Sequence, residues 1–312
     1  MNLLNFIATY PDEASCRTKF KEYRDQQGVI CPKCGHKEQY WKQDKSSCEC
    51  KHCHYRQSLR ANTVMHGSNL PFRYWFIAVH LLTSTKKSFS AAELQRQLGH
   101  KRHEPVWYLL HKLRGIMGKR NEQYPLLGVL ELDEGFFSTE TRKEAKTETQ
   151  KRGRGGQKKS KVLVMAESQP VEGERTKNGR PGKVGHVKMT VIKDLKSATV
   201  TPLVRENVSQ ASSIDSDHST SYVQLKDIVK EHGPKVIPQK ETGTVLPRVH
   251  IAISNAKRLL LNIYHDVKPE YLQNYLNEFC YKFNRRYFGE KLFDRLMIAS
   301  VTYKNQFRSK CG

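Results

Sequence analysis

Hydrophobic residues between Leu70 and Arg120 recur with the spacing of α-helices rather than of strands. They form three groups of period 3.6, namely Trp75, Ile77, Ala78, Leu81 and Leu82, then Leu94 and Leu98, then Trp107, Leu110, Leu113 and Ile116. Ser90 precedes the second group, and Glu93 stands three positions after Ser90, which is the pattern of a capping box. The pattern predicts three consecutive helices.

Downstream of these helices the pattern changes to that of β-strands. Three apolar runs, at residues 127–139, 161–166 and 186–192, predict an antiparallel meander. A fourth strand is expected to end near Asp217. The helices expected after it are at 219–229, at a segment that begins near residue 250, and at 269–286. Strands and helices in this order predict a mixed α/β domain.

The turn between the second and third predicted helices is short and basic. Gly99 ends one helix, and Lys101, Arg102 and His103 precede or open the next. This layout is typical of a helix-turn-helix, whose second helix presents its N-terminal end to the major groove of DNA. A plain three-helix scaffold is the alternative.

Charge favours a polyanionic partner. The chain of 312 residues has 54 Lys and Arg against 31 Asp and Glu, a formal net charge of +23. Such an excess indicates nucleic acid. Two glycine-rich basic stretches, 142–161 and 173–183, are expected to meet phosphate, with Arg152, Arg154, Lys158 and Lys159 as candidate DNA contacts.

The sequence contains neither an apolar run of about 20 residues, which a membrane-spanning helix requires, nor the features of a signal peptide at its start. A cytoplasmic protein is therefore expected.

Five of its eight cysteines lie in one short segment. In a reducing compartment such clustering indicates a metal site rather than disulfides.

Paired cysteines predict one structural zinc ion. Cys31 and Cys34 form one pair, and Cys50 and Cys53 form another with the same two-residue gap. Cys48 competes with Cys50, but only Cys50 reproduces that gap. Four thiolates close a tetrahedral zinc site and leave no position for catalysis.

Acidic residues stand at the ends of two predicted strands. Asp133 lies in the first, where Glu131 shares its face by alternation and Glu134 follows it directly. Asp217 ends the fourth strand, with Asp215 one pleat earlier as a possible substitute. Buried carboxylates are costly unless they bind a cation or a partner, so these residues are candidate metal ligands.

The motifs together resemble the zinc-ribbon DDE-type insertion-sequence transposases of the insertion-sequence fifteen-ninety-five family. The matching landmarks run from about residue 15 to residue 300 and include CPKCG with CKHC, LELDE, SDHSTSY, HIAISNAKRLL and NEFCYKFNRR. The resemblance implies a ribonuclease-H-like catalytic fold. It suggests a zinc ribbon within 1–60, a helix-turn-helix lobe at 61–122, a catalytic domain at 123–300 and a tail at 301–312.

The resemblance also implies roles for individual residues. Asp133, Asp217 and Asn255 would ligate two Mg²⁺ ions, with Mn²⁺ as a substitute, and Lys257 would contact phosphate. Asn255 stands where many related enzymes have Glu, and its loss of charge weakens the expected site.

The implied reaction is strand cleavage and strand transfer at terminal inverted repeats, by a bacterial, nucleoid-associated homodimer or larger assembly on double-stranded DNA. The substituted third position keeps a second hypothesis open, a DNA-binding regulator with an inactive metal site. A nuclease acting on branched DNA is a third.

Overall fold

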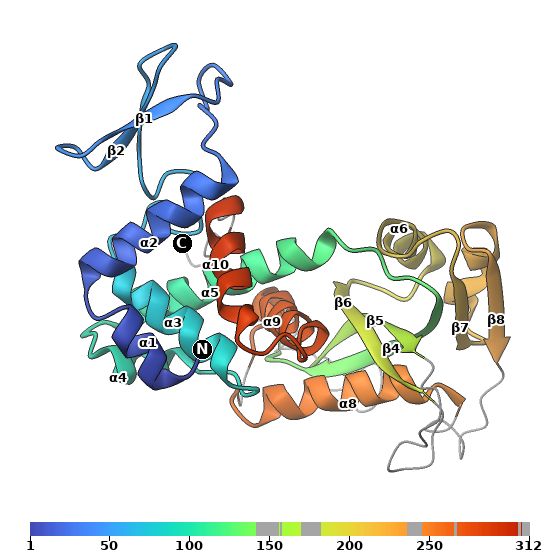
Figure 1. Ribbon diagram of the computed structural model, residues 1–312. Helices are drawn as coiled ribbons and strands as arrows, with labels where there is room; N and C mark the ends of the chain where they lie inside the picture. The colour runs from blue at the N-terminus through green and yellow to red at the C-terminus, as the bar shows by residue number, and fades with distance from the viewer. Residues whose placement is uncertain are drawn as a thin grey trace. The chain divides into compact units, whose positions relative to one another are not determined.

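A computed structural model defines the helices and strands of the chain (Figure 1). It describes residues 1–141, 156, 158–169, 182–235, 245–264, 267–304 and 307. The candidate DNA contacts Arg152 and Arg154 lie outside the described residues. Among the described residues, no helix is long and apolar enough to cross a membrane.

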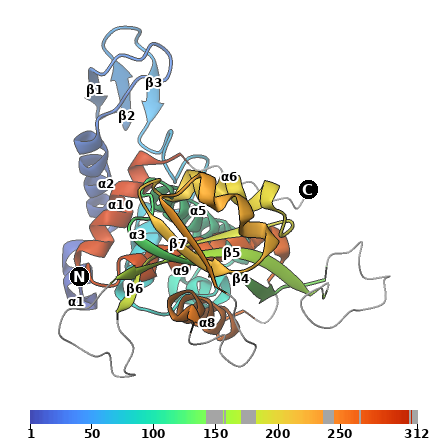
Figure 2. The same ribbon diagram turned by 90° about the vertical axis from the view of Figure 1, so that its right-hand side faces the viewer.

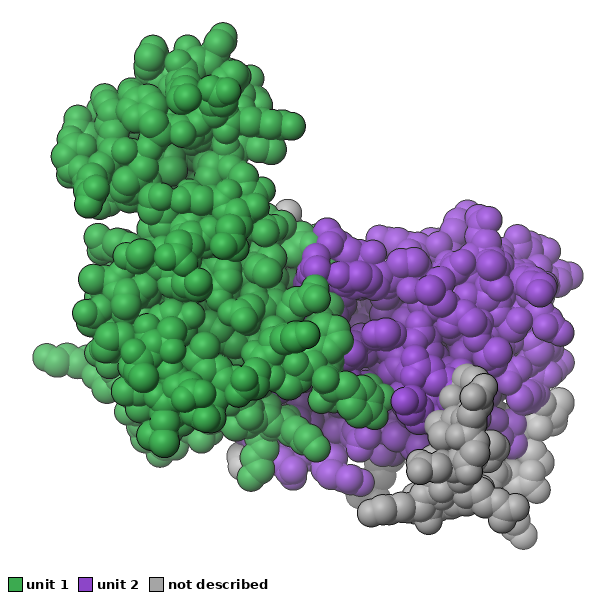
Figure 3. All heavy atoms as spheres, in the orientation of Figure 1, with its two compact units in different colours: residues 1–119, 285–312 green, residues 120–284 purple. Residues whose placement is uncertain are grey.

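The chain divides into two compact units (Figure 3). Unit 1 comprises residues 1–119 and 285–312, and unit 2 comprises residues 120–284. Unit 2 begins close to the start of the expected catalytic segment 123–300 and ends before its end, so the bounds of that domain stay a prediction. Residues 285–300 group with the N-terminal helices, because helix α10 (Lys291–Thr302) packs against α2 and α3.

Unit 1 is built mainly from helices. They are α1 (Leu3–Thr9), α2 (Glu13–Gln27), α3 (Phe72–Ser84), α4 (Ala91–Leu98), most of α5 (His103–Glu122), and α10. The three expected helices are thus present as α3, α4 and α5. Phe293 of α10 packs its ring against those of Phe6, Tyr10 and Phe76, which joins the last helix to the first ones.

The ends of α4 follow from local chemistry. The Ser90 side chain accepts a hydrogen bond of 3.1 Å from the backbone N–H of Glu93, as its spacing predicts. Gly99 ends the helix with φ of 61°, a left-handed conformation that favours glycine. The Gln95 side chain donates to the carbonyls of His100 and Lys101, so the turn into α5 is held by the preceding helix.

A small antiparallel sheet extends from the helices of unit 1 (Figure 2). Its strands are β1 (Gln39–Lys42), β2 (Ser47–Cys50) and β3 (Arg56–Ser58), with β2 in the middle. Glu49 of β2 is buried and binds Lys42, Tyr40 and Arg56 from the flanking strands. These three hydrogen-bond partners lower the pKa of the Glu49 carboxyl to about 2.

Unit 2 is organised by a five-stranded mixed sheet. Its strands are β4 (Val129–Ser138), β5 (Lys159–Gln169), β6 (Lys183–Ile192), β7 (Ser213–Asp217) and β8 (Glu231–Lys235), in the spatial order β6-β5-β4-β7-β8. β4, β5 and β6 form the expected antiparallel meander. β7 runs parallel to β4, and β8 runs parallel to β7.

Helices cover both faces of this sheet (Figure 1). On one face lie α8 (Pro247–Leu261) and α9 (Leu272–Asn284), preceded by the short helix η3 (Pro269–Tyr271); on the other lie α6 (Ser197–Asn207) and η2 (Thr220–Asp227). η2 corrects the expected α-helix over 219–229, since it is a 3-10 helix and shorter.

Side-chain alternation along β4 divides the core between the two faces. Leu130 and Leu132 pack with α6 and η2, while Phe137 packs with α8 and α9. Glu131 and Asp133 have the same parity as Phe137 and therefore lie on the α8 face. Glu131 and Asp133 thus face the helix that follows the sheet, whereas Glu134 has the opposite parity and interacts with Tyr222 of η2.

Candidate metal centres

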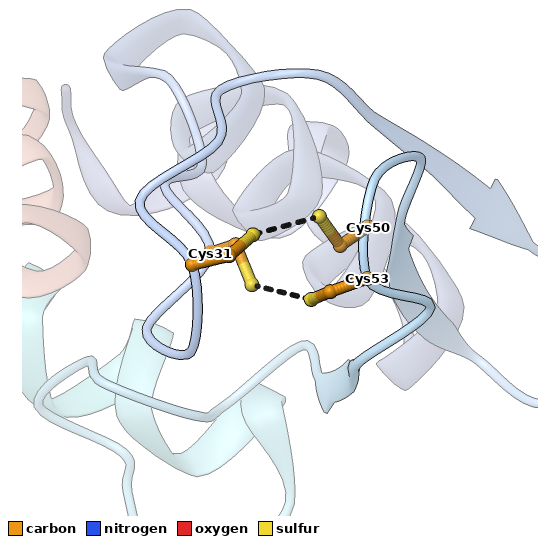
Figure 4. Close-up of side chains that lie close together, drawn as sticks. Cys31, Cys50 and Cys53 are labelled. Carbon is orange, nitrogen blue, oxygen red and sulfur yellow. Dashed lines mark hydrogen bonds between the residues drawn. The ribbon is translucent and has the colours of Figure 1, made fainter.

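Four cysteines of unit 1 form one compact group. One sulfur from each of Cys31, Cys34, Cys50 and Cys53 lies within 4.8 Å of all the others. The Sγ atoms of Cys31 and Cys53 are 3.5 Å apart (Figure 4). Those of Cys34 and Cys50 are also 3.5 Å apart. Tetrahedral zinc with Zn–S bonds of about 2.3 Å separates its sulfurs by about 3.8 Å, so the group fits a zinc ion.

The two cysteine pairs have the same backbone hydrogen bonds. In the first, Cys31 N–H donates to His36 O and Gly35 N–H donates to Cys31 O, both at 2.9 Å. In the second, Cys50 N–H donates to Tyr55 O at 3.0 Å and His54 N–H to Cys50 O at 3.1 Å. Each pair is a zinc knuckle in shape.

The knuckles explain why Cys50, and not Cys48, faces the other cysteines. Cys48 lies two positions earlier on β2, opposite Trp41 of β1, and is buried in the sheet. The two knuckles differ in the residue that takes the left-handed backbone conformation after the second cysteine. Gly35 occupies it with φ of 73°, as expected, whereas His54 occupies it with φ of 57°.

Three carboxylates of unit 2 form a second group. One oxygen from each of Asp133, Glu134 and Asp217 lies within 4.8 Å of the other two. The parallel register of β4 and β7 pairs Glu131 with Asp215 and Leu132 with Ser216, so the next positions, Asp133 and Asp217, are cross-strand neighbours. Register therefore unites the two expected aspartates.

The neighbouring carboxylate pair on these strands is bound to cations and backbone donors. Glu131 accepts from the backbone N–H groups of Arg248 and Val249 at 2.6 and 2.9 Å, and its other oxygen lies 3.1 Å from the Arg248 guanidinium. Asp215 forms an ion pair of 2.7 Å with Lys235 of β8. Glu131 thus caps α8, and Asp215 joins two strands, which assigns both to structure.

α8 runs along β4 with one side facing the acidic strand. Nδ1 of His250 lies 3.6 Å from Oδ2 of Asp133, and the ammonium of Lys257 lies 5.7 Å from the centre of the Phe137 ring. His250 and Lys257 are about two helical turns apart, so both occupy this side. The sequence did not identify His250, although its place near the start of a helix after an acidic strand was a usable signal.

Asn255 does not share that side of α8. It follows His250 by about 1.4 turns, which places it about 140° around the helix axis. The expectation that the helix lays Asn255 against both aspartates stays a prediction. Lys257 lies near Phe137 and interacts electrostatically with Asp133, and its phosphate contact stays a prediction.

Electrostatics of the acidic group extend to two lysines and a tyrosine. Burial, followed by the positive charge of Lys159, lowers the pKa of Lys257, while Asp133 opposes the shift. Burial, followed by the negative charge of Glu134, raises the pKa of the fully buried Tyr222 beneath the carboxylates. Cations and anions thus adjoin one another at this end of β4.

The remaining candidate DNA contacts are exposed. Lys101 and Arg102 lie in the turn before α5, and His103 is its first residue. Lys158 lies directly before β5, and Lys159 begins that strand. Among the described DNA-contact candidates of unit 2, Lys159 interacts electrostatically with Lys257, which itself interacts with Asp133.

Comparison with known proteins assigns the chain to a class. Residues 125–284, about half of the 312, match the ISXO2-like transposase domain, so the acidic group lies in a transposase domain. The chain belongs to the ISXO2-like transposase family and is a DNA transposase of a mobile element. The resemblance expected from the motifs is confirmed over these residues.

Two crystal structures are also similar to the chain. They are a pre-cleavage Mos1 transpososome, at 13% identity and a TM-score of 0.28, and the Mos1 strand transfer complex, at 15% and 0.27. Each comparison covers 77% of this chain and 81% of the other. Because both TM-scores are low, the fold is judged from the order of the strands in the sheet instead. Among curated proteins, none matches the sequence.

Proposed function

We propose that this transposase cleaves and joins DNA at the terminal inverted repeats of its element, using divalent metal held by Asp133 and Asp217. The observation that carries the proposal is their pairing across β4 and β7 within the transposase domain. Strand order adds support. An antiparallel meander extended by two parallel strands is the arrangement expected for the ribonuclease-H-like fold.

The donor set at this site suits hard divalent cations. Asp133, Glu134 and Asp217 offer carboxylate oxygens, which Mg²⁺ and Mn²⁺ prefer. Divalent metal, when bound, supplies activation of the attacking oxygen and stabilisation of the leaving oxygen. Asp133 would hold both ions, and Asp217 would hold one of them.

The flanking lysines orient the substrate in this proposal. Lys257 of α8 and Lys159 of β5 are close enough for their charges to interact, and the charge of Asp133 also acts on Lys257. A phosphate of the DNA backbone bound by these two ammonium groups would lie beside the carboxylates. Positive charge here also offsets the repulsion between phosphate and Asp133.

The N-terminal unit supplies DNA binding. We infer that Cys31, Cys34, Cys50 and Cys53 hold one structural Zn²⁺, and that α4 and α5 form a helix-turn-helix. The exposed Lys101, Arg102 and His103 support this, because they lie in the turn before α5 and at its first residue, where a recognition helix meets DNA. Joining two DNA ends in one reaction further favours a homodimer or larger assembly on DNA.

The test is an in vitro reaction with terminal-repeat DNA and Mg²⁺ or Mn²⁺. Asp133→Asn and Asp217→Asn should each reduce cleavage by more than about 100-fold, the upper end for residues that only orient a metal ligand. Asp215→Asn is the matched control. It removes a carboxylate from the same strand, but one already paired with Lys235, and should retain cleavage.

Full cleavage by Asp133→Asn or Asp217→Asn would overturn the proposed catalytic pair. Repeat-specific binding by the wild-type protein, with no cleavage under either metal, would instead support the DNA-binding regulator. Cleavage of branched DNA without preference for the repeats would support the nuclease.

A further inference from the structure

We propose that Tyr222 of η2 positions the carboxylate of Glu134 within the metal centre, from the face of the sheet opposite α8. The inference rests on the proposed metal-dependent function and adds to it a residue that acts through Glu134. It is carried by the place of Tyr222 beneath the three carboxylates, where strand β7 ends.

The first step concerns the end of β7. Its last residue, Asp217, lies next to Asp133 in the parallel register, whereas β4 continues beyond Asp133 to Ser138. From Glu134 onward, β4 therefore has no paired strand on its β7 side among the described residues. Side chains from both faces of the sheet can meet at such an end. Glu134 thereby has an oxygen within 4.8 Å of oxygens of Asp133 and Asp217, despite its opposite parity.

The second step concerns how the chain places Tyr222. Oδ1 of Asp217 accepts a hydrogen bond of 3.2 Å from the backbone N–H of Ser219. The carbonyl of Ser219 in turn accepts one of 3.1 Å from the backbone N–H of Tyr222. The Ser221 side chain donates to the carbonyl of Leu195, which ties the same turn to the chain before α6. One turn thus carries both Asp217 and Tyr222, so the tyrosine is fixed relative to that aspartate.

The third step concerns the surroundings of the Tyr222 side chain. It is 1% exposed and belongs to the same core cluster as Leu130 and Leu132 of β4. Its hydroxyl is buried, as is Oε1 of Glu134, and the Glu134 carboxylate is the hydrogen-bonding neighbour of the hydroxyl. A hydroxyl that is buried among apolar side chains needs a polar partner. Because burial and the charge of Glu134 raise the pKa of Tyr222, the hydroxyl keeps its proton and donates it to the carboxylate.

The fourth step concerns what this contact does. A hydrogen bond to a carboxylate fixes the orientation of the group, which is how residues behind a metal ligand affect metal binding. A donor beside Glu134 also offsets part of the repulsion among three neighbouring carboxylates. The competing role for Tyr222 is packing of its ring in the core. Phenylalanine would preserve that packing and remove only the hydroxyl, so the two roles can be separated.

The experiment is a titration of the full-length, zinc-loaded protein with Mn²⁺, in which electron paramagnetic resonance measures the free ion. Tyr222→Phe should lower the Mn²⁺ affinity by about tenfold, and Glu134→Gln by at least as much. In the Glu134→Gln protein, Tyr222→Phe should have little further effect, because the hydroxyl acts on the metal through that carboxylate. The matched control is Tyr281→Phe, which alters an equally buried tyrosine of α9 and should leave the affinity unchanged.

Other outcomes separate this inference from the function beneath it. Unchanged affinity in Tyr222→Phe, with binding lost in Asp133→Asn, would overturn the role of Tyr222 alone. Losses that add in the double variant, or failure of Tyr222→Phe to fold, would assign the hydroxyl another role. Unchanged affinity in Glu134→Gln would overturn the inference whether or not Tyr222→Phe folds. Mn²⁺ binding insensitive to Asp133→Asn and Asp217→Asn, or no binding, would overturn the proposed metal-dependent function as well.

Discussion

The cysteine group of unit 1 and the carboxylate group of unit 2 gather their ligands by different means. Four sulfurs come from two short knuckles, 31–34 and 50–53, each closed by its own backbone hydrogen bonds. The oxygens of Asp133 and Asp217 come from strands joined by the register of a parallel pair, far apart in sequence. One site is assembled locally and the other by the sheet.

This difference determines what each site needs from its surroundings. The knuckles repeat one geometry, so spacing alone selects Cys50 over Cys48. Among the acidic residues, spacing cannot select, because Glu131 and Asp215 alternate onto the same face as Asp133 and Asp217. Their partners make the selection, since Arg248 and Lys235 bind the first two.

The largest effect is expected from a substitution that breaks the cysteine group of unit 1, the locally assembled site. Cys50→Ser should lose the zinc ion and unfold the small sheet, because binding of structural zinc contributes about 10–16 kcal/mol to the folding of such lobes. Zinc content measured by mass spectrometry, together with amide hydrogen exchange of β1 to β3, checks this. Cys48→Ser is the matched control and should keep the zinc. Loss of zinc from Cys48→Ser alone would reverse the assignment.

A smaller effect is expected at the site assembled by the sheet. Glu131→Gln removes the charge that binds Arg248 and caps α8, and should destabilise unit 2 by about 2 kcal/mol. This loss of stability is smaller than the roughly 3–5 kcal/mol lost when one partner of a fully buried ion pair is removed, because Arg248 is partly exposed. Hydrogen exchange of the first turn of α8 measures the change.

The control for Glu131 is Asp215→Asn. Its ion pair with Lys235 is partly exposed on both sides and should contribute less than about 1 kcal/mol. Equal destabilisation by the two substitutions would contradict the view that Glu131 fixes the helix.

The smallest effect compares the two knuckles with each other. Gly35→Ala should cost about 1–2 kcal/mol, because a side chain disfavours the left-handed backbone, and the space around a Cβ at Gly35 is open. His54→Gly should stabilise the other knuckle by a similar or smaller amount. Zinc competition titrations measure both, at about tenfold in affinity per 1.4 kcal/mol. Shifts in the same direction would refute the comparison.

Much of the fold follows from periodicity. Alternation gave the three strands of the meander, and the apolar spacing gave α3, α4 and α5. β8 was missed because its sequence, EHGPK, contains Gly233 and Pro234 and has the composition of a turn. The placement of α10 was also missed, since an amphipathic helix does not encode in its own sequence which distant helices it will cover.

The candidate site was predictable in its ligand types and only partly in its membership. Cysteine spacing and the order of the acidic strands predicted residues that the structure brings together. The side of α8 that faces the acidic strand was not predictable, because the phase of the helix depends on the contact between Glu131 and its first turn. No periodicity in HIAISNAKRLL shows whether His250 or Asn255 faces the sheet.

That contact has an evolutionary consequence. With the helix phase set at its first turn, inserting or deleting one residue just after that turn would rotate the later side chains by about 100° relative to β4. The acidic strands would remain unchanged while a different residue of α8 faced Asp133. A change in chain length would therefore alter which side chain of α8 lies beside Asp133 without any substitution among the carboxylates.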